Sequence, residues 1–195
     1  METTRVEAFS DGVMAIALTI MVLELKAPDT PDLHGVAEFL PTLLTYILSF
    51  VYIGIYWSNH HHLMHLTKRV DGGALWANLN LLFWLSLVPF TTRWMDESSL
   101  SPLPVLVYGF NLLMSAVAYD ILQRRLIRLQ GADSRLASAI KNGVKEKVST
   151  ALYLVGCATA YVTVWASVAC YTAVAILWIV PDRRIERAVA ESNDA

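Results

Sequence analysis

Two groups of polar residues interrupt otherwise apolar stretches of this 195-residue chain. The first group lies in residues 6–25, VEAFSDGVMAIALTIMVLEL, and includes Glu7, Ser10 and Asp11. Acids within an apolar segment are costly, so they usually face protein or water and often mark ion pathways. The second group is the run of imidazoles in residues 60–65, which could bind a metal ion or titrate near neutral pH.

A metal site is one interpretation of the imidazole run. His61 and His65 are four residues apart and share one face of a helix, a spacing that suits zinc. A catalytic zinc site also needs a third ligand and a nearby base, and the nearest acid, Asp71, follows two basic residues. We therefore expect no metal and no cofactor. A membrane metal- or haem-binding protein that uses residues 60–65 stays open as an alternative.

The elements that carry both groups are predicted to be membrane-spanning helices. Hydrophobic residues make up 55% of the chain and charged residues 16%, whereas a soluble domain has about a quarter charged residues. One crossing needs about 20 apolar residues. We expect an all-α membrane protein that forms a single domain over 1–195. Its six predicted spans are 6–25, 39–62, 74–93, 102–122, 148–163 and 166–181.

Basic residues predict the orientation of these spans. With six spans and cytoplasmic N- and C-termini, 13 of the 15 basic residues lie in inner segments, and only Lys26 and Arg93 lie outside. Five spans would place three C-terminal arginines outside, against the positive-inside rule. Residues 123–147 are expected to form a cytoplasmic linker, partly as an amphipathic surface helix. The apolar residues spaced like one helical face are Leu126, Leu129, Leu136 and Ile140.

The first predicted span has two different faces. A projection at about 100° per residue places one apolar stripe along its whole length. The stripe contains Phe9, Ile16, Ile20 and Leu23, with Thr19 near its edge. Ser10 and Asp11 project away from the stripe, toward neighbouring helices. Plain alternatives are lipid contact or ordinary packing for the stripe, and an N-cap pair for the two polar residues.

The start of the chain resembles a known family signature. Arg5, Phe9, Ser10 and Asp11 form the pattern RxxxFSD, which GVMAIALTIMVLEL follows. This pattern is similar to that of the transmembrane protein 175 family of potassium channels, in its bacterial single-repeat form. YWSNHHHL, NLNLLFWLSLVPFTT and WIVPDRRIER also resemble the family, so the similarity covers most of the chain.

The resemblance implies a homotetramer of six-helix subunits whose first helices line a pore. Its constriction and selectivity residues would be Ile16, Thr19, Ile20 and Leu23, which coincide with the stripe found from helical geometry. No TVGYG or GYG string occurs in the sequence, and the outer loops are too short for a pore helix and filter. Four apolar stripes would form a narrow neck that gates by dewetting.

The resemblance also implies a polar network that holds the motif. Arg5 and Asp11 would contact residues of the second and third helices, and a histidine in the network would allow pH sensitivity. The matching positions are Asn59, His60 and His61, with Trp76 or Asn78. Which imidazole takes part stays open. Glu24 flanks the outer end of the stripe, where a carboxylate from each subunit could enrich cations; a plain interfacial role is the alternative.

The sequence therefore predicts a channel and not an enzyme. It would pass potassium and other monovalent cations through the bilayer of a prokaryotic cell membrane. A proton-permeable leak is the nearest alternative. A carrier with alternating access is a third, although such proteins usually show repeated halves and the second half has no RxxxFSD. The net charge of −2 gives no indication of nucleic-acid binding.

Overall fold

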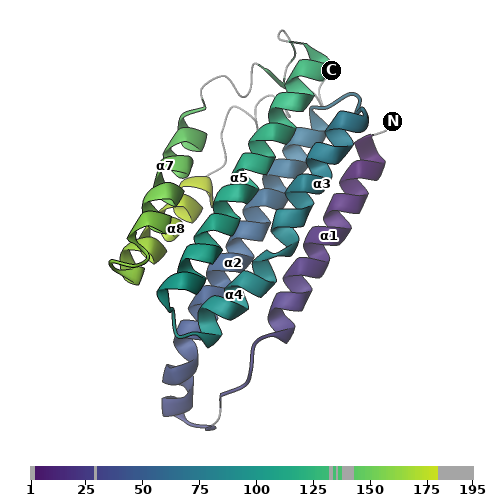
Figure 1. Cartoon of the computed structure of the whole chain (residues 1–195). Helices are drawn as coiled ribbons and strands as arrows, with labels where there is room; N and C mark the ends of the chain where they lie inside the picture. The colour runs from purple at the N-terminus through teal and green to yellow at the C-terminus, as the bar shows by residue number, and fades with distance from the viewer. Residues whose placement is uncertain (1–2, 29, 132–133, 135, 138–142, 180–195) are drawn as a thin grey trace.

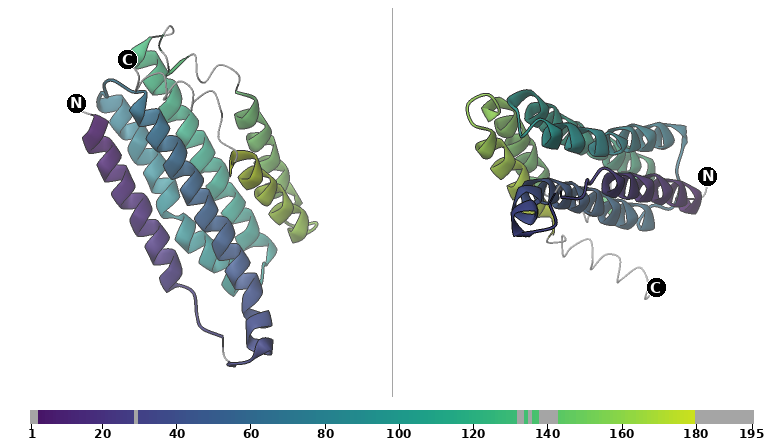
Figure 2. Two further views of the ribbon diagram at one scale, coloured as in Figure 1. Left: turned by 180° about the vertical axis from the view of Figure 1, so that it is seen from behind. Right: turned by 90° about the horizontal axis from the view of Figure 1, so that it is seen from below.

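A computed structural model describes residues 3–28, 30–131, 134, 136–137 and 143–179 (Figure 1). The regular secondary structure of these residues is helical. The helices are α1 (Thr3–Leu23), α2 (Leu33–His65), α3 (Gly72–Ser86), α4 (Val88–Glu97), α5 (Pro102–Gln130), α7 (Val144–Thr159) and α8 (Val164–Ile179). Helices α1 to α5 form an elongated bundle with α1 at one edge, and α7 and α8 form a hairpin on the opposite side (Figures 1 and 2). We call the end of the bundle where α1 begins and α5 ends the inner end.

Four segments of the described chain are long and apolar enough to cross a membrane. They are α1, α2, the α3–α4 segment Gly72–Glu97, and α5. Helices α7 and α8 have 16 residues each and are therefore about 24 Å long, shorter than the roughly 30 Å hydrocarbon core. The chain is a multi-pass helical membrane protein.

Several predicted boundaries differ from the observed ones; α2, for example, begins at Leu33 and not at residue 39. The third predicted span is two helices separated at Leu87, because Pro89 lacks an amide hydrogen and cannot continue the α3 ladder. The turn between α7 and α8 falls at residues 160–163, slightly before the expected position. The predicted linker at 123–147 begins later, since α5 continues to Gln130 with Leu126 fully buried. Of the apolar face predicted in this linker, Leu136 is buried and Ile140 lies outside the described residues.

Asp71 fixes the start of α3 and joins it to α5. Its Oδ1 accepts a hydrogen bond from the Ala74 amide at 2.8 Å, so it is the N-cap of α3. Its carboxylate also pairs with the Arg125 guanidinium of α5. The amide hydrogen bond and then the arginine hold the pKa of Asp71 below its usual range. The inner ends of the two helices are thereby held together.

Tyr171 joins the α7–α8 hairpin to the rest of the bundle. A β carbon at Gly109 of α5 would lie 1.9 Å from the Tyr171 hydroxyl, and one at Gly156 of α7 would lie 2.4 Å from its ring. The Tyr171 hydroxyl donates to the Val105 carbonyl at 3.3 Å, and the Tyr52 hydroxyl donates to the Tyr171 carbonyl at 2.5 Å. Small residues thus permit the close approach of three helices, as is common in membranes.

Gly109→Ala is expected to lower the free energy of unfolding by about 1–3 kcal/mol, because the added methyl group must displace a fully buried ring. Unfolding of the purified protein in detergent measures this change. Gly54→Ala is the matched control, since a β carbon at Gly54 of α2 meets no atom within 4 Å. There we expect equal or greater stability, because alanine favours a helix over glycine by about 1 kcal/mol. Equal losses in both variants would contradict this account of the packing.

Candidate functional site

Helix α1 presents two faces with different surroundings. One face packs against α2, α3 and α4. Its buried residues recur every three or four positions, which is one stripe of a helix. They are Val6, Ser10, Met14, Ala17 and Met21. The opposite face is open in the single chain, because α1 lies at the edge of the bundle (Figure 1).

The predicted constriction residues all lie on this open face. Ile16, Ile20 and Leu23 are 60%, 43% and 81% exposed. Thr19 is also exposed, and its hydroxyl donates to the Ile16 carbonyl at 2.9 Å. Apolar residues of other helices are exposed to the same degree in the single chain, for example Ile176 of α8 at 61%. The position of the stripe on a bundle edge makes it accessible to another copy of the chain.

The buried face of α1 carries a chain of hydrogen bonds to α2 and α3. The Asn78 side-chain amide donates to the Ser10 hydroxyl at 2.9 Å, and this hydroxyl donates to the Val6 carbonyl at 2.8 Å. His60 Nε2 lies 2.8 Å from Asn78 Oδ1. Because Oδ1 can only accept, Nε2 carries the ring proton in this arrangement. Ser10, His60 and Asn78 are each at most 2% exposed, so a missing partner here would be costly.

A second set of contacts joins α1 to α2 closer to the surface. The Trp57 indole donates to Asp11 Oδ1 at 3.0 Å, and His61 Nδ1 lies 2.7 Å from Glu7 Oε1. Trp57 and Glu7 were absent from the predicted network. Their spacing provides a signal, because Glu7 precedes Asp11 by four residues and Trp57 precedes His61 by four, which places each pair on one helical face.

Asn59 does not join this cluster, so its predicted role in the network is wrong. Its side-chain amide donates to the Ile55 carbonyl at 2.8 Å, and its own carbonyl accepts from the Tyr119 hydroxyl at 3.1 Å. The reason is rotational, since neighbouring residues of a helix point about 100° apart. With His60 directed at α3, Asn59 is turned toward α5 instead.

Two motif residues also lie outside the hydrogen-bonded cluster. Arg5 is exposed and has no hydrogen bond or ion pair with any residue that the structure describes, so its place in the network stays a prediction. Phe9 is 55% exposed and extends the open stripe. Of the two predicted alternatives in the third span, Asn78 is the contact, because Trp76 is 75% exposed.

The imidazole run is not arranged as a metal site. The rings of His61 and His65 are stacked with centroids 6.3 Å apart, and His61 Nδ1 is occupied by Glu7. Among the described residues, no three side chains of His, Cys, Asp or Glu converge closely enough to hold an ion. The described geometry offers no support for the metal-binding alternative.

Glu24 is paired at the outer end of α1 and does not stand alone. It forms an ion pair with Arg93 of α4. Arg93 Nε also lies 3.0 Å from Glu97, and Lys26 Nζ lies 3.8 Å from the same carboxylate. These four side chains carry no net charge. Glu24 is thus paired within one chain, and its predicted role in enriching cations at the outer mouth stays a prediction.

Comparisons with known proteins identify the family. Residues 5–89 match the family described as endosomal/lysosomal potassium channel TMEM175. A potassium channel of Chryseobacterium sp. (strain P1-3) is 48% identical over 188 residues, which are 96% of this chain and 98% of that protein. The chain belongs to the TMEM175 family. It is an ion channel and not an enzyme.

Two further relatives show how far the similarity extends within the TMEM175 family. The crystal structure of a lysosomal potassium-selective channel TMEM175 homologue from Chamaesiphon minutus has a TM-score of 0.76 and 32% identity, over 93% of this chain and 98% of that one. The human endosomal/lysosomal proton channel TMEM175 is 36% identical over 92 residues, only 40% of this chain and 18% of the human protein. The fold is therefore shared across nearly the whole bacterial channel, and the similarity to the human protein is partial.

Proposed function

We propose that the chain forms a homotetrameric channel that conducts potassium and other monovalent cations across a prokaryotic cell membrane. The observation that carries the proposal is the two-faced α1, which is anchored on one side and exposes Ile16, Thr19, Ile20 and Leu23 on the other. Four copies around one axis would bring these stripes together. The Chryseobacterium and Chamaesiphon relatives are named potassium channels, which supports potassium as the ion, and their bacterial sources support a prokaryotic cell membrane as the location.

The constriction would act as a gate and a filter. Large aliphatic side chains around an axis disfavour water, so small changes in pore width switch the neck between wet and dry states. Thr19 would place a hydroxyl oxygen in this neck, where it could replace one water of a partly dehydrated cation. The contacts of Ser10 and Asn78 on the opposite face would hold α1 at a fixed distance from the axis.

The membrane topology is part of the same proposal. Six spans with cytoplasmic N- and C-termini place the inner end in the cytoplasm, in agreement with the positive-inside rule. Helices α7 and α8 would be the two short spans, joined by a turn at residues 160–163. Residues 180–195, which hold three of the predicted inner arginines, lie outside the described residues.

A proton channel is the second candidate, because the partial relative from human is named a proton channel. Reversal potentials of the purified protein in planar bilayers distinguish the two. One tenfold change of an ion concentration corresponds to about 1.4 kcal/mol, which a voltage of about 60 mV balances. We expect the reversal potential to shift by nearly this amount with a tenfold potassium gradient and by far less with one pH unit. The opposite result would show that the channel conducts protons and not potassium.

A further inference from the structure

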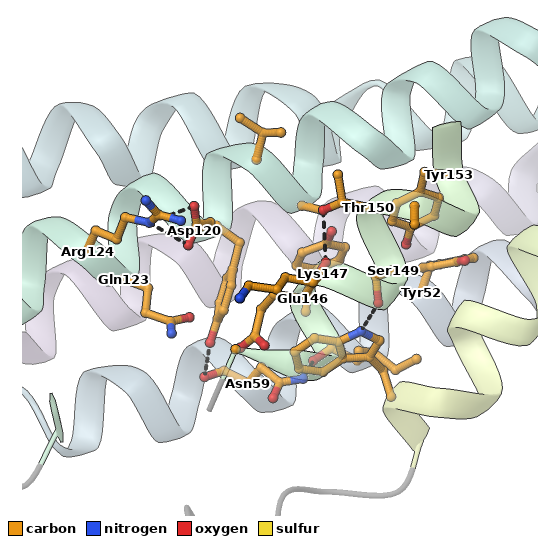
Figure 3. A pocket seen from close by; sticks show the side chains of 18 of the residues that line it. Tyr52, Asn59, Asp120, Gln123, Arg124, Glu146, Lys147, Ser149, Thr150 and Tyr153 are labelled. Atoms are coloured by element: carbon orange, nitrogen blue, oxygen red, sulfur yellow. Dashed lines mark hydrogen bonds and ion pairs between the residues drawn. The ribbon is translucent and has the colours of Figure 1, made fainter. Parts of the chain in front are cut away.

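A cavity of about 660 Å³ lies between α2, α5, α7 and α8 (Figure 3). No residue of α1 lines it, so the cavity is separate from the proposed pore. Its volume is typical of sites for small molecules. A cavity of this size in a membrane channel offers a place where a ligand could bind without entering the ion path.

The cavity changes from apolar to charged along its length. On α5 the lining begins at Ala116 and Val117 and reaches Asp120, Arg124 and then Ile127 toward the C-terminus. On α7 it runs from Leu154 back to Lys147, Glu146 and the N-cap Gly143. The two helices are antiparallel (Figure 1), so both charged ends lie at the inner end of the bundle. The apolar wall of the cavity reaches the outer surface of the helical bundle, because Val117 and Leu154 are 37% and 55% exposed. A ligand that fits this gradient is an amphiphile with its polar group at the inner end.

Gln123 contributes a polar side-chain amide to the lining of the cavity. It is 6% exposed and lines the cavity between the side chains of α5 and α7 (Figure 3). Its amide has no hydrogen bond with any residue that the structure describes. A ligand in the cavity that carries a hydrogen-bond acceptor or donor could therefore bind this amide.

The charged groups at the polar end balance one another. Arg124 pairs with Asp120, with Nε and Oδ2 2.8 Å apart. Glu146 and Lys147 also line the cavity, and neither has an ion pair within the described chain. Two carboxylates and two cations match a headgroup that carries both signs. A purely anionic headgroup has no amine, so the carboxylates of Asp120 and Glu146 would repel its phosphate without any compensating attraction.

We propose that this cavity binds a zwitterionic phospholipid with a primary-amine headgroup, of the phosphatidylethanolamine type, from the leaflet at the inner end. The phosphate lies near Arg124 and Lys147, and the ammonium group lies near Glu146. The Gln123 amide donates to a phosphate or ester oxygen. One acyl chain follows the apolar wall outward past Leu154. The lipid thereby fills the space between α5 and the α7–α8 hairpin.

Native mass spectrometry of the delipidated, full-length protein tests this site. We expect one phosphatidylethanolamine per chain, bound about tenfold or more tightly than phosphatidylglycerol, because only phosphatidylethanolamine carries an ammonium group that can pair with Glu146. Soluble phosphoethanolamine should bind far more weakly, since it lacks the acyl chain.

Gln123→Leu should weaken lipid binding by about tenfold, and Ala116→Phe should abolish it by filling the cavity. Arg128→Gln, one turn beyond Arg124 and outside the lining, is the matched control and should bind as the wild type does.

Several outcomes would overturn the proposal. Equal affinity for the two lipids would show general lipid contact, and no retained lipid would show that the chain itself fills the cavity. If soluble phosphoethanolamine bound as tightly as phosphatidylethanolamine, the acyl chain would contribute nothing to binding. Wild-type lipid binding by the Ala116→Phe variant would show that the lipid binds outside this cavity. The comparison of lipids on the wild-type protein decides the question even where a variant fails to fold.

Discussion

Ile16→Asn is expected to increase the single-channel potassium conductance by about tenfold or more and to reduce the preference for potassium over sodium. The substitution replaces four aliphatic side chains of the proposed neck by amides that can hydrogen-bond to water or to the passing ion. One net hydrogen bond contributes about 0.5–1.5 kcal/mol. Four subunits together would therefore lower the barrier by about 2 kcal/mol or more, and about 1.4 kcal/mol suffices for a tenfold rate.

Ile176→Asn is the matched control for this measurement. Ile176 lies on α8, away from α1, and its exposed fraction of 61% is close to the 60% of Ile16. Both substitutions thus place the same amide at an equally exposed position of the single chain. Recording in planar bilayers should show wild-type conductance and selectivity for Ile176→Asn. Unchanged conductance in both variants would place the Ile16 stripe against lipid and would contradict the proposed pore.

The two faces of α1 could be predicted from the sequence because helical periodicity alone determines them. Residues three or four apart share a face, so a stripe that contains Ile16 and Ile20 excludes Ser10 from that stripe. The structure places Ser10 at 0% exposure and Ile16 at 60%. No knowledge of the neighbouring helices was needed for this inference.

The partners of α1 could not be predicted in the same way. Three consecutive histidines point in three directions, and the packing of α3 decides that His60 contacts Asn78 while His61 contacts Glu7. The pairing of Glu24 with Arg93 joins residues 69 positions apart. It depends on how α4 continues after the break at Leu87, which no local pattern specifies.

The cavity could not be predicted from the sequence for a related reason. Charged residues end an apolar stretch, so Gln123 and Arg124 were expected at the start of a linker. Helix α5 nevertheless continues, because Leu122 and Leu126 stay fully buried. A hydropathy pattern averages over both sides of a helix and therefore misses a segment that is buried on one side and polar on the other.

Asn78→Leu is expected to lower the stability of the channel and to alter its open probability. The substitution removes the partners of two fully buried groups, Ser10 and His60. Side-chain hydrogen bonds within membrane proteins contribute about 0.6 kcal/mol on average and up to about 1.7 kcal/mol. Two lost bonds should therefore cost about 1–3 kcal/mol in unfolding experiments. The functional effect follows because these bonds hold α1, which carries the proposed constriction.

Asn111→Leu separates this effect from the general loss of a buried amide. Asn111 of α5 is also 2% exposed, but its amide contacts Thr91 of α4 at 3.4 Å and does not reach α1. We expect Asn111→Leu to leave the open probability unchanged. A double-mutant cycle of Asn78→Leu with Ser10→Ala should give a coupling of about 0.6–1.7 kcal/mol. A coupling near zero, or equal gating changes in both asparagine variants, would mean that these hydrogen bonds do not set the position of α1.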